Sequence, residues 1–428
     1  MEKCHTLKRY TITFLLMVLV VFSLNAQAVF TEYSGKIIDG RSNKALEAVS
    51  LNINETNIGT ITNSEGEFVI KVASDYLDSK VTISLLGYDT YSVPLSQLAK
   101  ADNVIKLYVA VTELSAVSIS AFKNAESLVQ KVFRDKMQHL DDQSLFMTAF
   151  YRETIKRRNR NVSLTEAVVN ILKQPNSSSL RDAIQLSKAR KSTDYKRLDT
   201  VSVKLQGGPF SALYLDIMKY PEHIFTEESI KIYNFSFDEP SVINNRAVYV
   251  VNFIPKANVV GVNYIGKLFI DVELLALAGA DYALDLSDKK RTKNLLVKKK
   301  PKDIVVYPLE ASYKVAYKVN GKTWYYNYSN LNLKFKINKK KQLFNKVYTL
   351  ASEMAVTNWE VNSTDKRIKI KDRLKPTMVI TDAISGFSDP NFWGKYNLIE
   401  PDKSIEFAIA KIKKNIEKEK QDKKKKSS

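Results

Sequence analysis

Apolar and polar residues alternate along several stretches of this chain. Apolar positions recur at every second residue in 45–53, 313–319 and 331–337, and lysine or asparagine fills many of the positions between them. A period of two predicts strands that are buried on one side only. Asn320-Gly321 is a typical hairpin turn after the second stretch. We therefore predict an antiparallel sheet with one apolar face and one wet, basic face.

Other stretches follow the helical period, with apolar residues three or four positions apart. Residues 124–139 predict a helix with Leu128 and Val132 on its apolar face, and a short helix is expected near 211–218. Residues 401–428 predict a C-terminal helix that runs into a basic tail. The expected fold class is mainly β with helices: an N-terminal antiparallel β-sandwich plus a larger curved antiparallel sheet packed with helices.

The first residues have the three-part layout of a secretory signal. Basic residues precede the apolar run 11–24, and the small-residue stretch 26–28 follows it. We expect cleavage after Ala28 and export to the periplasm or the outer membrane. The alternative is a retained anchor, but the run is shorter than the roughly 20 residues of a spanning helix. Cys4, the only cysteine, would leave with the leader, which excludes disulfides and Cys-ligated zinc from the mature chain.

The chain is strongly basic. Its formal net charge is +20, and removal of the leader takes away three positive charges and one negative charge, which leaves +18. In an exported protein, a basic surface favours membrane headgroups, acidic glycans or lipopolysaccharide phosphates, and no nucleic-acid partner is expected. The lysine-rich runs 289–293 and 298–302 predict a solvated loop, and the alternative is a peripheral contact with an anionic membrane surface.

The expected N-terminal strands contain an ordered set of short motifs. The motifs are Gly35-x-Ile37-x-Asp39, Leu46-x-Ala48-Val49, Gly59-Thr60-x-Thr62-Asn63-x-x-Gly66-x-Phe68 and Gly87-Tyr88. The set resembles the carboxypeptidase-regulatory-like domain that is common in exported Bacteroidetes proteins. Ala45 and Glu47 depart from the family's usual proline and small residue in a turn. The resemblance implies a transthyretin-like sandwich, which accompanies zinc carboxypeptidases but contains none of their catalytic groups.

Two later segments extend the resemblance to most of the mature chain. Residues 150–153 and 387–401 are similar to segments of exported Bacteroidetes proteins in which such a sandwich precedes an uncharacterised β-rich domain. No activity comes with this resemblance. The expected organisation is a signal peptide at 1–28, the sandwich at 29–112, a linker and helix at 113–140, the β-rich domain at 141–400, and the C-terminal helix and basic tail at 401–428.

No catalytic or cofactor motif is present in the sequence. His139 and His223 stand in no His-x-x-Glu arrangement, so they do not predict a zinc site. A Gly-x-Ser-x-Gly elbow and a phosphate-binding glycine loop are also absent. We therefore expect no enzyme activity, no cofactor and no metal.

The sequence predicts a non-enzymatic binding or accessory protein of the cell envelope. The expected sheet either covers its own core or leaves part of its apolar face open as a half-barrel groove for a hydrophobic or anionic component. The partner would be a lipid, a glycan or an envelope protein. Candidate ligand or packing residues are Tyr151, Arg152, Glu153, Trp393 and Tyr396.

Two other functions remain open. One is a hydrolase of envelope polymers, with Glu153 or Glu166 as acid or base. The other is a structural accessory of an outer-membrane transport complex. A pocket that joins two carboxylates would favour the hydrolase, and co-purification with outer-membrane proteins would favour the accessory.

Overall fold

The computed structural model describes most of the chain between residues 30 and 410. The expected signal peptide, most of the linker, His139, and the greater part of the C-terminal helix and tail lie outside the described residues. The described residues are 30–110, 122, 124–138, 140, 142–158, 160–193, 205–257, 259, 261–293, 296–297, 302–339, 345–384, 393–402, 405–406 and 409–410.

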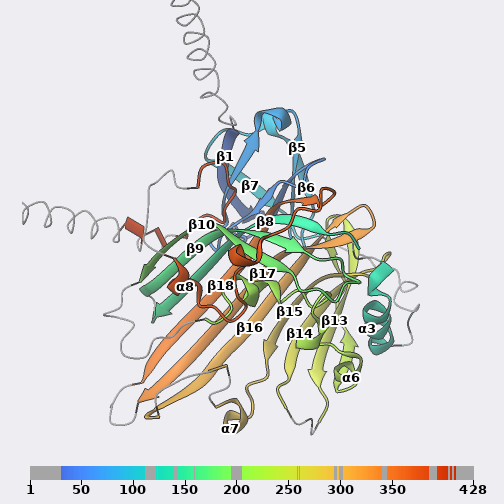
Figure 1. Ribbon diagram of the computed structural model, residues 1–428. Helices are drawn as coiled ribbons and strands as arrows, with labels where there is room; N and C mark the ends of the chain where they lie inside the picture. Colours follow the sequence, from blue (N-terminus) through green and yellow to red (C-terminus); the bar gives the residue numbers. More distant parts are fainter. Residues whose placement is uncertain are drawn as a thin grey trace, which may run out of the picture.

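The first part of the chain forms a small β-sandwich, coloured blue in Figure 1. One sheet has the strand order β4-β1-β7 and the other has the order β3-β2-β5-β6. Gly35 lets β1 and β7 approach closely, because a Cβ there would collide with the carbonyl of Asn103. The elements are β1 (Phe30–Asp39), β2 (Ser50–Ile53), β3 (Gly59–Ile61), β4 (Glu67–Ala73), η1 (Ser74–Tyr76), β5 (Lys80–Ser84), β6 (Tyr91–Pro94), η2 (Leu95–Gln97) and β7 (Asn103–Leu107).

An open antiparallel sheet makes up the larger part of the described chain. Its order is β10-β9-β8-β18-β17-β16-β15-β14-β13-β11, and β12 also pairs with β13. The fold class predicted from the sequence is confirmed. The strands are β8 (Leu145–Arg157), β9 (Arg160–Lys173), β10 (Ala183–Thr193), β11 (Tyr233–Phe237), β12 (Ser241–Ile243), β13 (Arg246–Pro255), β14 (Tyr264–Asp271), β15 (Leu277–Leu284), β16 (Ile304–Asn320), β17 (Thr323–Lys339) and β18 (Lys346–Val361).

The predicted hairpin is present at the expected place. Strands β16 and β17 pair along almost their whole length, and Asn320 pairs with Thr323 at the turn. Gly321 has a φ of +60°, a left-handed conformation that glycine adopts without strain. Alternation of apolar and polar residues therefore located these strands correctly.

Short helices cover one face of the large sheet, which we call the helix-covered face. Leu128 and Val132 of the first helix and Phe210 and Leu213 of the second belong to the same buried cluster as sheet residues such as Tyr151. This apolar face is filled by the protein's own core. The helices are α3 (Ala125–Arg134), α5 (Pro209–Leu213), α6 (Glu227–Ile230), α7 (Lys289–Thr292) and α8 (Ile380–Ala383), with 3-10 turns η3 (Lys136–Gln138), η4 (Pro221–His223) and η5 (Ile370–Asp372).

Two of these helices are shorter than the sequence predicted. The helix expected over 124–139 ends at Arg134, after which the chain continues into η3. Its N-cap is Asn124, whose side chain accepts a hydrogen bond from the Ser127 amide at 2.8 Å. The helix expected near 211–218 is replaced by α5, which ends at Leu213.

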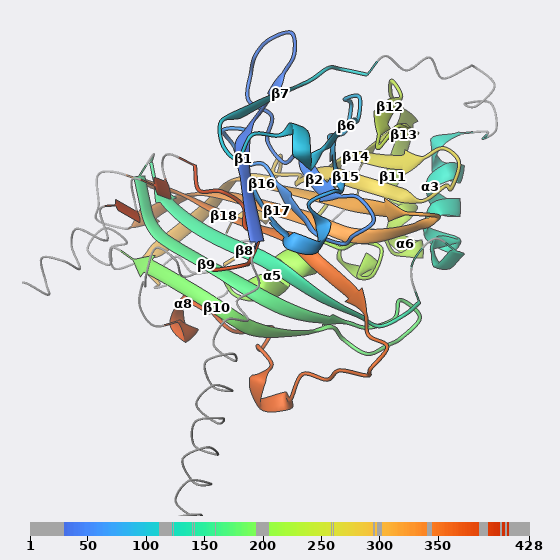
Figure 2. The ribbon, with the colours of Figure 1, turned by 90° about the horizontal axis from the view of Figure 1, so that it is seen from above.

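The sandwich lies on the opposite face of the large sheet, as Figures 1 and 2 show. We call this the sandwich-covered face. Asn57 of the sandwich donates to the carbonyl of Trp359 in β18 at 2.9 Å, and the Gly87 amide donates to the carbonyl of Val242 in β12 at 2.7 Å. The prediction of a wet, basic second face is therefore wrong where the sandwich docks, because those side chains face another part of the protein.

Residues 393–402, which we call the bridging segment, connect the sandwich to the large sheet. Asn397 accepts a hydrogen bond from the Lys71 amide at 2.7 Å, and the carbonyl of Leu398 accepts one from Thr60 at 2.7 Å. On the other side, Arg152 of β8 donates to the carbonyl of Ile399. The segment thus joins strands that are far apart in the sequence.

Candidate functional site

A cleft separates the sandwich from the middle of the large sheet. It consists of three adjoining cavities of about 110, 210 and 190 Å³. The first two cavities share Ala48 and Tyr328 as walls, and the second and third share Asn330 and Asn332. We refer to these as the apolar cavity, the middle cavity and the polar cavity.

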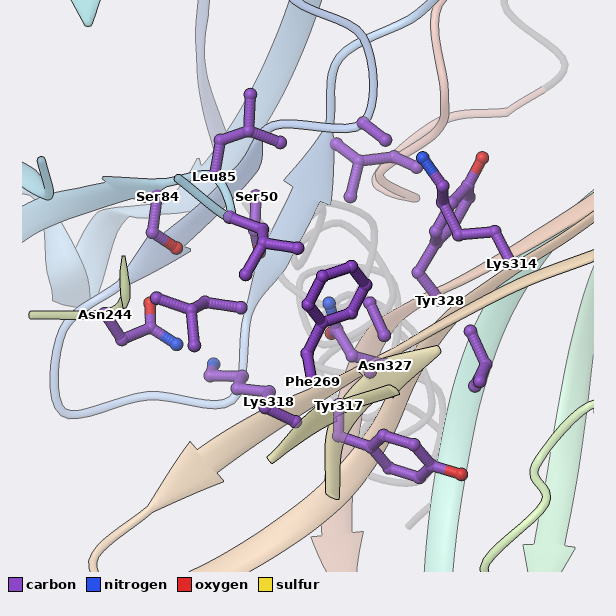
Figure 3. Close-up of a pocket in the computed structure, with 18 of the residues that line it drawn as sticks. Ser50, Ser84, Leu85, Asn244, Phe269, Lys314, Tyr317, Lys318, Asn327 and Tyr328 are labelled. Atoms are coloured by element: carbon purple, nitrogen blue, oxygen red, sulfur yellow. The ribbon is translucent and has the colours of Figure 1, made fainter. Parts of the chain in front are cut away.

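The apolar cavity lies between β2 and β5 of the sandwich and β14 to β17 of the large sheet. Its floor is made by Ala316, which stands between Gly279 on one neighbouring strand and Tyr328 on the other. Figure 3 shows the Phe269 ring at its centre, below Leu85 of the sandwich. Small residues on the floor and larger apolar residues around it leave a space that suits an apolar group.

Lys318 lines one end of the apolar cavity. Its ammonium donates to the side-chain carbonyl of Asn52 in β2 at 2.8 Å. Figure 3 places it beside Asn244, at the end away from Lys314 and Tyr328. Burial lowers the pKa of Lys318 from its usual 10.5 to about 8.

The middle and polar cavities are lined mostly by polar side chains. Asn330 and Asn332 alternate along β17 on the sandwich-covered face, and Glu47 faces them from the sandwich. Lys314 and Asp281 form an ion pair of 3.4 Å at the boundary with the apolar cavity, and both are half-exposed. The cleft therefore changes from apolar to polar along its length.

A buried ion-pair network closes the polar end of the cleft. Arg152 pairs with Glu166 at 2.8 Å and with Glu353 at 3.2 Å, and Glu166 also pairs with Arg190 at 2.6 Å. Burial by itself would lower the pKa of Arg152, but the charges of Glu166 and Glu353 raise this pKa above its usual value. Burial also raises the pKa of Glu353, although Arg152 opposes that shift. The four residues lie on β8, β9, β10 and β18, and Figure 2 shows these strands beside the sandwich.

The candidate residues of β8 are divided between the two faces of the sheet. Arg152 faces the sandwich, while Tyr151 and Glu153 point to the helix-covered face, where the Tyr151 hydroxyl donates to the Glu153 carboxylate at 2.9 Å. Glu166 faces the sandwich with Arg152. The two carboxylates named for a hydrolase, Glu153 and Glu166, therefore lie on opposite faces and share no pocket.

Glu153 is a buried acid on the helix-covered face. It is 2% exposed, and its hydrogen bond from Tyr151 only partly offsets the loss of water. Burial raises the pKa of Glu153 from 4.5 to about 7. Across the neighbouring strands it stands opposite Ser352 and Thr165.

The other two candidates, Trp393 and Tyr396, belong to the bridging segment. Trp393 is buried and packs edge-on against Phe150 with a centroid distance of 5.7 Å. The Arg190 guanidinium lies 5.0 Å above the Trp393 ring. The Tyr396 hydroxyl lies 3.2 Å from the hydroxyl of Ser187 in β10. These contacts hold the segment against the sheet, and neither Trp393 nor Tyr396 is among the residues that line the three cavities.

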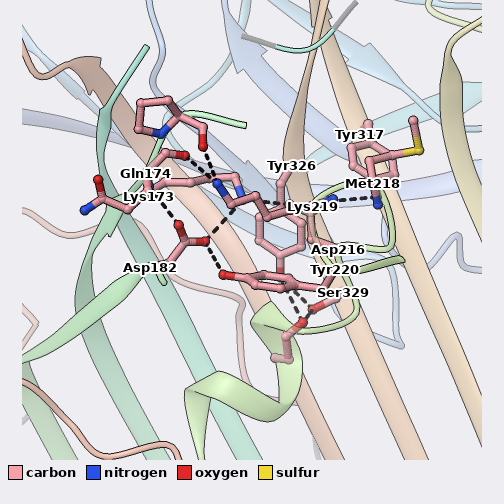
Figure 4. Close-up of polar contacts among 12 residues, drawn as sticks. Lys173, Gln174, Asp182, Asp216, Met218, Lys219, Tyr220, Tyr317, Tyr326 and Ser329 are labelled. Atoms are coloured by element: carbon pink, nitrogen blue, oxygen red, sulfur yellow. Dashed lines mark hydrogen bonds and ion pairs between the residues drawn. The ribbon is translucent and has the colours of Figure 1, made fainter. Parts of the chain in front are cut away.

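A second buried polar network lies on the helix-covered face and is drawn in Figure 4. Lys173 pairs with Asp216 at 2.7 Å and with Asp182 at 3.4 Å. Tyr220 donates to Asp182 at 2.6 Å, and Tyr317 donates to Asp216 at 2.9 Å. Each carboxylate thus has both a cation and a phenol as partners, and the network ties the loop around Asp216 to β9 and β16.

Sequence reasoning did not identify the cleft, Lys318 or the network around Lys173. Lys318 sits in the same alternating pattern as Lys314, and nothing in that pattern indicates that Lys318 is the less exposed of the two. A search of the described residues finds no group of three or more His, Cys, Asp or Glu side chains placed to hold a metal ion. None of the described helices has the length and apolar composition of a membrane span.

Comparisons with known proteins identify one part of the chain. A DUF1329 family protein from Desulfovibrio piger is 9% identical, with a TM-score of 0.24 over 57% of this chain and 96% of that one. A putative outer membrane lipoprotein-sorting protein domain from Vibrio parahaemolyticus is 12% identical, with a TM-score of 0.23 over 58% and 95%. At these scores neither structure carries a conclusion about this chain, and no curated protein matches it. The family model of the CarboxypepD_reg-like domain matches residues 33–119, which confirms the resemblance of the N-terminal sandwich.

Proposed function

We propose that this protein is a non-enzymatic binding protein of the cell envelope that holds the apolar part of a small envelope component in the cleft. The observation that carries this proposal is the apolar cavity of about 110 Å³ between the sandwich and the large sheet. The secretory layout of residues 1–28 supports export to the periplasm or the outer membrane. The regulatory-like sandwich is not a catalytic domain in the family it resembles, which agrees with a binding role.

The shape of the cleft supports a ligand with two different ends. A group in the apolar cavity would contact Phe269 and Leu85, and a polar group attached to it would reach the asparagines of β17 through the middle cavity. Polar side chains at a few fixed positions around an apolar space are typical of small-molecule sites. A lipid fragment or a glycolipid has this combination of properties.

Purification of the protein from its native envelope, followed by native mass spectrometry, tests the proposal. We expect a bound mass in addition to that of the mature chain. Ala316→Leu should remove this mass, because the larger side chain fills the floor of the apolar cavity, while thermal unfolding should show a folded protein.

The matched control is Ala101→Leu, which makes the same change at an exposed turn of the sandwich. It should keep the bound mass. A bare protein mass from the native envelope, or a bound mass that Ala316→Leu does not change, would contradict the proposal. Co-purification with outer-membrane proteins and no small ligand would favour the structural-accessory alternative.

A further inference from the structure

Lys318 is a partly buried cation whose polar contacts are few. Its only hydrogen bond among the described residues goes to the neutral amide of Asn52, although an ammonium has three donors. Lys314, four residues earlier on the same strand and face, pairs with Asp281 and is half-exposed. The two lysines therefore differ in exposure and in charge partner: Lys318 is the less exposed of the two, and it makes no ion pair with another described residue.

The surroundings of Lys318 explain why this arrangement is unfavourable by itself. The cavity lining includes the apolar Leu86 and Ile243. Figure 3 places the uncharged Ser84 and Asn244 on the same side of the cavity as Lys318. An ammonium that is partly withdrawn from water in such a setting is stabilised by an anion, because it has lost hydration and gained a single neutral hydrogen-bond acceptor in return. The cavity beside Lys318 provides the room for one.

We propose that the apolar cavity recognises a short aliphatic carboxylate, with the carboxylate on the ammonium of Lys318 and the chain against Phe269. This inference rests on the proposed function, since it assigns the ligand class of the same cavity. A cavity of about 150 Å³ holds one benzene molecule, so about 110 Å³ suits an alkyl chain of roughly four carbons, the length that pentanoate carries on its carboxylate. A phosphate dianion would need more donors than one lysine and a few uncharged groups supply.

Ligand-observed NMR titrations with pentanoate and 1-pentanol test the inference, because the two probes share a chain and differ in charge. We expect the wild-type protein to bind pentanoate at least about tenfold more tightly than 1-pentanol, as a charge-assisted hydrogen bond is worth about this much. Lys318→Met should abolish the preference, because methionine has a similar length and carries no charge. Lys318→Arg should retain the preference, because the charge remains.

The pH dependence of pentanoate binding gives a second readout. The charged side chains that line the apolar cavity with Lys318 are Lys314 and Asp281, and these pair with each other. Wild-type affinity for pentanoate should therefore fall as the pH rises above about 8, where Lys318 loses its proton. The Lys318→Arg variant should show no such fall, because guanidinium keeps its proton.

Lys334→Met is the matched control, since Lys334 is exposed on the neighbouring strand β17. It should leave both affinities unchanged. Equal binding of the two probes, or a preference that survives Lys318→Met, would overturn the carboxylate inference and leave the cavity's binding function standing. Binding of neither probe would also overturn it, whereas the proposed function is judged separately by the mass that co-purifies from the envelope.

Discussion

Arg152→Met is expected to lower the free energy of unfolding by roughly 3 to 5 kcal/mol, the largest effect of any substitution considered for this protein. The variant removes the guanidinium that pairs with the partly buried Glu353, and it leaves the buried Glu166 with Arg190 as its remaining ion-pair partner. It also removes the donor to the carbonyls of Ile399 and Glu400 in the bridging segment. Urea unfolding followed by tryptophan fluorescence would measure the change.

The position of Arg152 predicts a second, local effect. Because its guanidinium connects β8 to the bridging segment, hydrogen exchange should become faster at residues 393–402 in the variant. Arg367→Met is the control, since Arg367 pairs with Asp365 at 2.6 Å on the surface, with 77% of its side chain exposed. An exposed pair of this kind contributes about 0 to 1 kcal/mol. Equal losses in the two variants would contradict the expectation that removal of Arg152 leaves costly uncompensated charge in the buried network.

The strands could be predicted from the sequence because burial on a sheet alternates residue by residue. Leu331, Leu333 and Phe335 are buried and their intervening residues are less so, as the period of two requires. The turn at Asn320-Gly321 has local chemistry that specifies it. Both features depend on neighbouring residues, and this explains why a single sequence reveals them.

The covered face of the large sheet could not be predicted in this way. A polar or basic residue between apolar ones indicates the second face of a strand, but not whether another domain lies over that face. Lys318 is partly buried because Asn52, 266 residues away in sequence, docks above it. Such a contact depends on how two separately folded surfaces fit together, and the local pattern contains no information on it.

The candidate site was predicted only in part, and the stretch Tyr151-Arg152-Glu153 shows why. These neighbours resemble a single motif in the sequence, yet in a strand adjacent side chains point to opposite faces. Arg152 therefore reaches the polar cavity, while Glu153 is buried beneath the helices. The period of two along the strand already implied that Arg152 and Glu153 face opposite ways. The ion-pair partners of Arg152, such as Glu353, can be identified only when the order of the strands in the sheet is known.

Glu153→Gln is expected to stabilise the protein at alkaline pH and to leave its stability unchanged in acid. Burial raises the pKa of Glu153 to about 7 in the folded protein, against 4.5 as the ordinary value. Between these values the unfolded chain loses the proton and the folded protein keeps it, so the wild-type free energy of unfolding falls as the pH rises from about 4.5 to about 7. The difference in pKa corresponds to roughly 3 kcal/mol.

The glutamine variant has no proton to lose at this position, so its free energy of unfolding should not contain the pH-dependent loss that comes from ionisation of Glu153. Urea unfolding should therefore give equal free energies for the two proteins near pH 4, and should favour the variant by up to roughly 3 kcal/mol near pH 8. Glu310→Gln is the control, because Glu310 is exposed on β16 and its substitution should make no comparable difference. If Glu153→Gln changed the free energy of unfolding at neither pH, the Glu153 carboxylate would have to be solvated or paired in the folded protein. Ionisation of Glu153 would then not destabilise the fold, contrary to the expectation from its burial.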